Sequence, residues 1–368
     1  MKIVYVEGSN IVNPKKTGVG NYHFNLLNEV KNKLDLSINI FDKDKNKEKY
    51  LFSDFYKYIN INKYCDLKYS LILPYKKIFN IEKEDILLVD GFPFILPATS
   101  KKIGFIHDLM SIEYAKEYSL KSKFIIYLFF KKARKYNKII TVSQTTKNKI
   151  VNLLKIDSKK IEVISPGINL NEFLQIKNEK EIDIHKKFGI KKPYFLYVGA
   201  LRKNKNIDKI IEIFSEYSLN NEKIQLVISG DKKGEYLELL KLVETKKIKN
   251  KVIFTGFIEE NEKKFLYKNC SLFCFLSKDE GFGIPLLEAM AYQKPILASN
   301  IEIFKEITKG KIELVDLDNK EKIMKLIDKS LFNFNYLENI KKIYLEILKE
   351  YDIKYLGEKF YRILKELK

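Results

Sequence analysis

The sequence predicts an α/β protein built from two doubly wound domains, and three observations support this. The chain has 368 residues, which suits two domains better than one. Short apolar runs that end in small or polar residues alternate with helical patterns, as expected for parallel strands covered on both faces. The alternation pauses at the Ser-Pro-Gly of residues 165–167 and then resumes. Gly167 is therefore the predicted boundary between the domains.

The predicted strands fall into two series. The first half of the chain contributes the runs 2–6, 86–90, 103–107 and 139–142. The second half contributes the runs 194–198, 225–229, 252–254, 272–276, 295–298 and 312–315. Helical periodicity fills most of the gaps, for example at 20–30 and 121–136, and the last segment, 337–368, is expected to be helical throughout. The stretch 43–62 has no clear period and receives no assignment.

Composition limits the classes of partner and the compartment. The 68 Lys and Arg residues exceed the 48 Asp and Glu residues, and the net charge of +20 favours anionic partners, although lysine enrichment along the whole chain contributes to it. Cys270 and Cys274 lie in an apolar run without His or Cys partners, so we expect buried thiols, not a zinc site. Few cysteines suit a reducing cytoplasm. No apolar run reaches the roughly 20 residues of a membrane span, and the N-terminus reads as a strand and not as a signal peptide.

Open parallel sheets bind ligands at the carboxyl ends of their strands, so the loops at these ends are the candidate sites. Gly18 and Gly20 open a helix and permit close approach of a phosphate, although a plain turn explains them equally well. His107 ends a predicted strand and is either a hydrogen-bond donor in a cleft or a structural histidine. Arg202 and Lys205 follow Gly199 in a cationic loop suited to phosphate, for which a solvated loop is the alternative.

The most specific pattern is the run Glu-Gly-Phe-Gly-Ile-Pro-Leu-Leu-Glu-Ala-Met at residues 280–290. Gly281 and Gly283 permit a tight turn, and Pro285 fits the first turn of a helix. Glu280 precedes this helix and Glu288 lies within it. Two carboxylates at different levels of one site are suited to the hydroxyls of a ribose and of a hexose.

This run resembles the Glu-x7-Glu signature of glycosyltransferase family 4. Further matching motifs occur in the family's order at residues 18–22, 107–108, 141–143, 165–169, 198–202 and 205–206. The resemblance implies the GT-B fold, two Rossmann-like doubly wound domains facing a central cleft. Residues 1–167 would bind the acceptor, with a helix at about 351–368 packing back on them, and residues 168–350 would bind a nucleotide-sugar.

The resemblance also implies roles for individual residues. Arg202 and Lys205 would hold the donor pyrophosphate, Glu288 the ribose, and Glu280 the donor sugar. Further expected donor contacts are the amides of Phe282, Gly283 and Ile284, the loop with Gly18 and Gly20, His107 near the transferred sugar, and the loop around Phe257 at the nucleobase. The chain departs from the family at Asn204, where Arg is frequent, and at Gln293-Lys294.

The resemblance implies that a hexose is transferred, with retention of configuration, from a UDP- or GDP-linked donor to a glycan or lipid-linked acceptor. This reaction would serve the synthesis of cell-surface polysaccharide or glycolipid. The enzyme would be similar to a mannosyltransferase. No Asp-x-Asp run lies at a strand end that faces the expected cleft, so we expect no metal and no cofactor. The runner-up is a nucleotide-sugar epimerase or phosphorylase of the same fold. Ser143 is interpreted as a helix N-cap.

A basic segment suggests a membrane surface as a further partner. Residues 101–150 contain 12 Lys or Arg against 3 Asp or Glu, and Lys121–Lys135 combines these cations with the apolar block 124–130. Such a helix suits the anionic inner face of the cell membrane if its aromatic side chains point outward; an ordinary domain helix is the alternative. Nucleic acid is not an expected partner, because charge alone explains neither the carboxylate motif nor the two series of strands.

Overall fold

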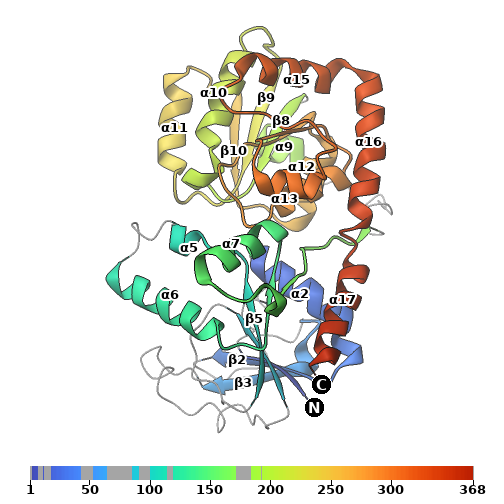
Figure 1. Cartoon of the computed structure of the whole chain (residues 1–368). Coiled ribbons are helices and arrows are strands. Elements are labelled where there is room, and N and C mark those ends of the chain that lie inside the picture. The colour runs from blue at the N-terminus through green and yellow to red at the C-terminus, as the bar shows by residue number, and fades with distance from the viewer. Residues whose placement is uncertain are drawn as a thin grey trace. The chain divides into compact units, whose positions relative to one another are not determined.

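The computed structural model describes residues 2–6, 11, 18–42, 53–63, 85–90, 100–113, 119–170, 184–191 and 193–367. The chain divides into two compact units, traced by colour along the chain in Figure 1. Unit 1 consists of Met1–Gly167 together with Tyr351–Lys368, and unit 2 consists of Ile168–Glu350. Each unit is built around one parallel sheet.

The sheet of unit 1 has seven strands in the order β3-β2-β1-β4-β5-β6-β7. All neighbouring pairs are parallel. The strands are β1 (Ile3–Tyr5), β2 (Leu36–Asp42), β3 (Ile59–Lys63), β4 (Ile86–Asp90), β5 (Lys101–Ile106), β6 (Lys138–Thr141) and β7 (Ile161–Val163). The α-helices are α2 (Gly18–Val30), α5 (Met110–Glu113), α6 (Leu120–Ala133), α7 (Gln144–Leu154) and α17 (Ile353–Glu366).

The sheet of unit 2 has five parallel strands in the order β10-β9-β8-β11-β12. The strands are β8 (Tyr194–Val198), β9 (Gln225–Ser229), β10 (Val252–Gly256), β11 (Leu272–Phe275) and β12 (Ile296–Ala298). The α-helices are α9 (Ile184–Phe188), α10 (Ile207–Tyr217), α11 (Tyr236–Thr245), α12 (Glu260–Asn269), α13 (Ile284–Ala291), α14 (Glu302–Thr308), α15 (Lys320–Phe332) and α16 (Phe334–Lys349).

Both sheets change direction of winding at a defined place, and this place determines where ligands bind. In unit 1 the strand order reverses between β1 and β4, and in unit 2 it reverses between β8 and β11. The two strands on either side of this reversal are followed by helices that cover opposite faces of the sheet. The loops at the carboxyl ends of these two strands therefore run apart and leave a crevice between them. The loops after β4, β8 and β11 are therefore the ones to search for a site.

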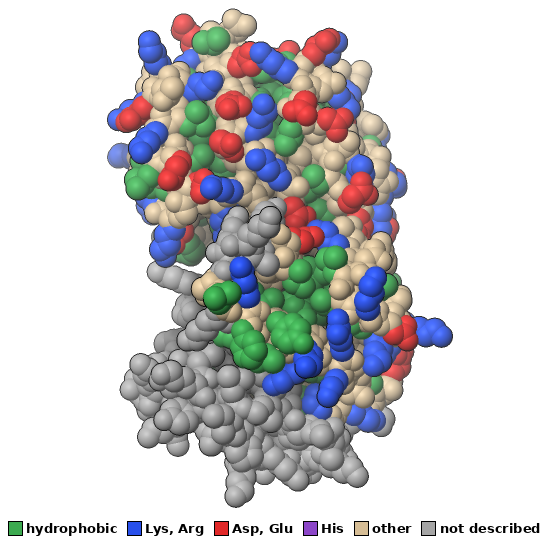
Figure 2. Space-filling model, turned by 60° about the vertical axis from the view of Figure 1, so that its left-hand side comes forward, with side chains coloured by type: hydrophobic (Ala, Val, Ile, Leu, Met, Phe, Trp, Pro, Cys, Tyr) green, Lys and Arg blue, Asp and Glu red, His purple; other side chains and the backbone are tan. Residues whose placement is uncertain are grey.

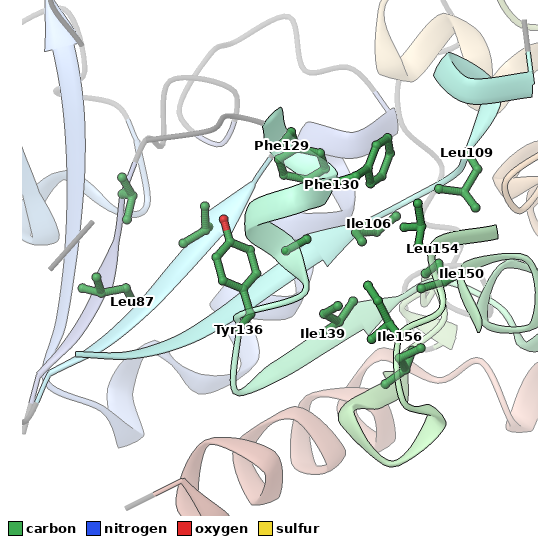
Figure 3. Packing of buried hydrophobic residues seen from close by; sticks show 14 of the residues in the cluster. Leu87, Ile106, Leu109, Phe129, Phe130, Tyr136, Ile139, Ile150, Leu154 and Ile156 are labelled. Atoms are coloured by element: carbon green, nitrogen blue, oxygen red, sulfur yellow. The ribbon is translucent and has the colours of Figure 1, made fainter. Parts of the chain in front are cut away.

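Helix α6 shows how the sequence pattern becomes packing. Its N-cap residue Ser119 accepts a hydrogen bond from the amide of Ser122 at 3.2 Å, which satisfies a helix-end donor. Phe129, Phe130 and Ala133 then point into the core of unit 1, which Figure 3 shows from close by. The cluster also includes side chains of the strands, of α7 and of the segments that join them, among them Leu87, Ile106, Leu109, Tyr136, Ile139, Ile150, Leu154 and Ile156.

The last helix belongs to unit 1, although the chain reaches it only after completing unit 2. Helix α17 packs against α2. Gly357 makes this close contact possible, because a Cβ at this position would lie 2.5 Å from Cβ of Glu29. Lys33 and Glu358 form an exposed ion pair across the same contact.

Several sequence expectations need correction. Residues 312–315 form no strand; Val315 makes one isolated bridge to Ser299. The helical segment at the end of the chain is two helices, α16 and α17, separated at residues 350–352. The unassigned stretch 43–62 contains the first four residues of β3. Strands β2 and β7 were also not predicted.

Other expectations are confirmed. Cys270 and Cys274 are buried free thiols, and burial raises the pKa of Cys270 to about 12. Ser143 is the N-cap of α7 and accepts a hydrogen bond from the amide of Thr146 at 3.0 Å. In the part of the chain that the structure describes, no helix has the length and apolar character to cross a bilayer.

Candidate functional site

Two loops meet at the switch point of unit 2, one after β8 and one after β11. The amide of Lys278 donates to the carbonyl of Asn204 at 2.8 Å. The Asn204 side chain donates to the carbonyl of Asp279 at 3.2 Å, and the Asn206 side chain donates to the carbonyl of Leu276 at 3.1 Å. These three bonds fix the relative positions of the two loops that the sequence predicts as donor contacts.

Lys205 and Glu280 form the charged centre of this loop pair. The Nζ atom of Lys205 lies 2.6 Å from each carboxylate oxygen of Glu280. The Ser277 hydroxyl donates to Oε1 of the same carboxylate at 2.8 Å. Both charged side chains are largely shielded from water, with 18% of Lys205 and 8% of Glu280 exposed. An ion pair with so little exposure has a fixed geometry and is costly to leave half-formed.

Helix α13 begins directly after this centre. Its N-cap residue is Gly283, which has no side chain to cap the helix, and Pro285 occupies the first turn. Gly283 has φ +129, which side-chain-bearing residues rarely adopt, and a Cβ there would lie 3.0 Å from the Phe304 ring. The local sequence therefore places a helix amino end, with its partial positive charge, next to Glu280 and Lys205. Phe282 is buried and Ile284 is half-buried.

Glu288, on α13, is held by a second ion pair. Its Oε1 atom lies 2.6 Å from Nζ of Lys263 on α12, and Lys263 also lies 3.1 Å from Glu260. Burial alone would lower the pKa of Lys263, but the Glu288 and Glu260 carboxylates outweigh burial and raise it, so Lys263 stays charged. The hydroxyl of the nearby Tyr267 donates to the carbonyl of Pro285 at 3.5 Å, and burial, with the Glu288 charge as a smaller cause, raises the pKa of this tyrosine well above its usual value.

The remaining predicted donor contacts of unit 2 are more open. Arg202 is exposed at the start of the 203–205 turn. Phe257 follows β10 and has 60% of its surface exposed. In unit 1, Gly18 is exposed at the first position of α2, and Gly20 is buried in its first turn. The predicted residues of unit 2 thus lie on the loops after β8, β10 and β11 or, for Ile284 and Glu288, on helix α13, which follows the last of these loops.

His107 lies in unit 1, just past the end of β5, and it is not isolated. Its Nε2 atom lies 3.0 Å from Nε2 of His23 on α2 and 3.5 Å from Oδ1 of Asp90 at the end of β4. Oδ2 of Asp90 lies 3.2 Å from Nε2 of His23. Burial lowers the pKa of His23. Burial would raise the pKa of Asp90, but the two imidazoles outweigh it and hold that pKa well below its usual range.

Sequence reasoning missed several partners in both units. His23 and Asp90 were not predicted, although the sheet order gives a signal, because β4 and β5 are neighbours and their carboxyl ends lie at one edge. Lys263 also was not predicted. It lies on a helix that carries no motif, and only the fold brings it to Glu288.

Helix α6 has one face that is buried in unit 1 and another face on which apolar side chains are exposed. Phe129 and Phe130 are buried, whereas 84% of Leu120, 60% of Phe124 and 58% of Tyr127 are exposed. The Nζ atom of Lys131 lies 5.7 Å from the centre of the Tyr127 ring. Figure 2 shows a patch of apolar side chains bordered by Lys and Arg side chains on one face of the molecule. The aromatic residues of the predicted membrane segment are therefore divided between the core and the surface.

Two family models match this chain. The model of glycosyltransferase family 4 matches residues 18–172, and that of glycosyl transferases group 1 matches residues 179–343. Together they cover most of unit 1 and most of unit 2. The chain belongs to glycosyltransferase family 4.

Curated relatives of this family 4 chain include enzymes of O-antigen synthesis. It is 31% identical to the O-antigen chain mannosyltransferase RfbU of Salmonella typhimurium strain LT2 over 226 residues, 61% of this chain and 60% of that protein. It is 26% identical to the O-antigen biosynthesis glycosyltransferase WclY of Escherichia coli, over 89% of this chain and 88% of that protein. The chain thus spans less than two thirds of the length of RfbU.

Solved structures show that the chain has the GT-B fold. Anabaena HepE, in complex with UDP and glucose, superposes with a TM-score of 0.73 at 16% identity and covers 100% of both chains. WaaG, a glycosyltransferase involved in lipopolysaccharide biosynthesis, superposes with a TM-score of 0.70 at 15% identity, covering 99% of each chain. At such identities the likeness concerns the fold alone.

Proposed function

We propose that this family 4 protein is a retaining glycosyltransferase that moves a hexose from a nucleoside-diphosphate sugar to a glycan or lipid-linked acceptor in cell-surface polysaccharide synthesis. The observation that carries the proposal is the centre at the unit 2 switch point. There Lys205, Glu280 and the amino end of α13 adjoin one another, and Glu288 lies on the same helix. A cation and a helix amino end suit a diphosphate, and carboxylates suit sugar hydroxyls.

Binding of the donor at this site would replace the ion pair between Lys205 and Glu280 by an ion pair between Lys205 and the donor diphosphate. Without donor, the charge of Lys205 is compensated by Glu280 at 2.6 Å. A diphosphate carries more negative charge than one carboxylate and would draw Lys205 and the exposed Arg202 toward itself. Glu280 would then accept a hydrogen bond from a hydroxyl of the donor sugar while Ser277 still holds its other side. Glu288 would accept from the ribose, with Lys263 keeping its orientation.

The proposed step breaks the bond between the anomeric carbon and the diphosphate oxygen and forms a bond from that carbon to the acceptor oxygen on the same face. Negative charge develops on the leaving phosphate, and Lys205, Arg202 and the α13 amides stabilise it. The departing phosphate oxygen takes the proton of the acceptor hydroxyl, so charge and protons balance. This chemistry needs side-chain cations and not a bridging metal. The donor-contact roles that the family resemblance implies for His107, Gly18 and Gly20 are part of the same proposal.

The test is product analysis with a panel of UDP- and GDP-linked sugars, starting with mannosyl donors because RfbU is a mannosyltransferase. The expected products are a nucleoside diphosphate and a glycosylated acceptor with the donor's anomeric configuration, read by NMR. The Glu280→Gln variant is the control, with turnover expected to fall by at least about 100-fold. Transfer onto inorganic phosphate or an epimerised donor would support the alternative class of enzyme, and inversion of configuration would overturn the retaining mechanism.

We also propose that the α6 surface attaches the enzyme to the anionic inner face of the cell membrane, where a lipid-linked acceptor would be found. The exposed Leu120, Phe124 and Tyr127 can enter the interface, and each nearby Lys or Arg contributes about 1 kcal/mol of attraction to anionic lipid. Phe129 and Phe130 take no part, because they are core residues.

Vesicle co-sedimentation tests this attachment. Wild-type protein is expected to bind vesicles in proportion to their content of anionic lipid, and binding should weaken with salt. The double variant Phe124→Ser with Tyr127→Ser should bind several-fold less. Leu237→Ser, which changes another exposed apolar residue on α11 of unit 2, is the matched control and should bind normally. If strongly anionic vesicles at low salt retain no wild-type protein, the membrane proposal is wrong.

A further inference from the structure

Three side chains of unit 1 direct their ligand-type atoms at one another. They come from three separate elements: His23 from α2, Asp90 from the end of β4, and His107 from just beyond β5. The two Nε2 atoms are 3.0 Å apart, and the Asp90 carboxylate lies 3.2 Å from His23 Nε2 and 3.5 Å from His107 Nε2. Among the residues that the structure describes, this is the one group of three His, Cys, Asp or Glu side chains close enough to share a metal ion.

Hydrogen bonding does not satisfy all three contacts at once. Each Nε2 atom carries either one proton or one lone pair. If one imidazole presents Nε2–H, the other presents a lone pair that faces the Asp90 carboxylate without a proton between them. If both present Nε2–H, two donors oppose each other at 3.0 Å. A cation at the centre is attracted by both nitrogens and by the carboxylate.

The separations also agree with metal coordination. Zinc bonds His nitrogen at about 2.0–2.1 Å and carboxylate oxygen at about 2.0–2.2 Å, so a tetrahedral site places its ligand atoms about 3.3 Å apart. The two Nε2 atoms are 3.0 Å apart, and each has an Asp90 oxygen at a comparable distance, Oδ2 at 3.2 Å from His23 and Oδ1 at 3.5 Å from His107. With one ligand atom taken from each residue, all three atoms lie within 4.8 Å of one another. Two imidazoles with one carboxylate suit zinc and similar ions, whereas magnesium and calcium prefer oxygen ligands alone.

Aromatic neighbours hold the imidazole rings in this arrangement. The Phe105 ring meets the His23 ring edge-on at 4.5 Å and stacks with the His107 ring at 6.4 Å. Tyr22 meets His107 edge-on at 5.3 Å. Packing of this kind preorganises a site, because the ligands need not move to bind. The group is open on one side, since 1% of His23 but 14% of Asp90 and 18% of His107 is exposed. The exposed parts of Asp90 and His107 give a cation access from solvent.

We propose that His23, Asp90 and His107 form a binding site for a zinc-type divalent cation in unit 1. The ligand atoms are the two Nε2 atoms and one oxygen of Asp90. Nδ1 of His107 remains available to hydrogen-bond another group. All three ligands belong to unit 1, and one of them, His107, is also an expected contact of the donor sugar in the proposed function. The metal proposal rests on the ligand geometry and not on the transfer reaction.

The test uses the full chain without an affinity tag of histidines, stripped of metal by EDTA and dialysed. Calorimetric titration with zinc chloride, together with elemental analysis after desalting, is expected to give one zinc per chain. Cobalt loading should give the intense visible absorption of a tetrahedral site. Replacing a ligand, as in His23→Gln or Asp90→Asn, should raise the Kd at least about 100-fold, since even loss of an outer hydrogen-bond partner typically costs 10–100-fold.

The chain offers a matched control, because it contains only three histidines. His185→Gln changes the third one, on α9 in unit 2, and should bind zinc as the wild type does. Circular dichroism and thermal unfolding check that each variant is folded. No bound zinc in the wild type, or equal binding by a folded His23→Gln variant, overturns the proposal. Because the readout is metal binding, a negative result leaves the proposed transferase activity untouched, and the reverse also holds.

Discussion

Replacing Lys205 by Met should destabilise unit 2 as well as weaken donor binding. The change removes the cation that lies 2.6 Å from both oxygens of Glu280, whose side chain is only 8% exposed. Removing one partner of a buried ion pair lowers the free energy of unfolding by about 3–5 kcal/mol, because the remaining charge is left without a partner. Lys205 is 18% exposed, so some solvent screening applies, and we expect about 2–3 kcal/mol. For a unit of this size the Tm should fall by about 4–12 °C.

A second substitution separates stability from binding. In the Lys205→Met background, Glu280→Gln removes the unpaired charge and should restore most of the Tm, while nucleoside-diphosphate binding stays weak. Thermal unfolding by circular dichroism and calorimetric titration with nucleoside diphosphate measure the two effects. Lys209→Met is the matched control, because its ion pair with Glu212 is exposed and should contribute under about 0.5 kcal/mol. If Lys205→Met leaves both the Tm and the Kd unchanged, the assignment of this centre is wrong.

Three further predictions concern the donor site and the core. Glu280→Gln should reduce turnover more than nucleotide affinity, and Glu288→Gln should mainly reduce affinity; calorimetry with free nucleoside diphosphate would expose reversed roles. Magnesium or manganese added to chelator-treated enzyme should leave turnover unchanged, whereas a large gain would show that the donor diphosphate needs a metal. Because burial raises the pKa of Cys270 to about 12, almost none of its thiolate form exists at pH 8. In a Cys65→Ser background, iodoacetamide should therefore label native protein very slowly and guanidinium-unfolded protein fast; fast native labelling would show an accessible thiol.

The fold was predictable where strands are buried on both faces. The run 194–198 is continuously apolar and the run 86–90 is apolar up to Asp90, and the structure has β8 and β4 at these residues. Strand β2 was missed because Leu36, Ile38 and Ile40 alternate with polar residues, a pattern that the search for continuous runs passes over. Strands β3 and β7 lie at the sheet edges, where fewer apolar residues are needed. Such edge strands form because of contacts with residues distant in the sequence, and local β propensity alone does not predict them.

The sequence predicts which loops form the site, but it does not predict which charged residues of the site form ion pairs with one another. Glu280 and Lys205 stand out because each follows the end of a strand close to a glycine. Their ion pair joins residues 75 positions apart, and it depends on β8 lying next to β11. The same holds for Lys263, which lies 25 positions before Glu288 on another helix and reaches it only in the folded unit. A motif identifies the chemistry of a residue, whereas strand order decides its partner.

The late position of helix α17 in the sequence affects how the protein folds during translation. Unit 1 includes residues 351–368, so its α2 face stays uncovered until the whole of unit 2 has been translated. Unit 2 is continuous in sequence and can fold as it emerges, whereas unit 1 must wait with an apolar surface open to chaperones. A stalled or prematurely terminated chain that lacks α17 would present this surface permanently. Such a chain would expose residues that α17 covers in the folded protein, and exposed apolar surface favours aggregation.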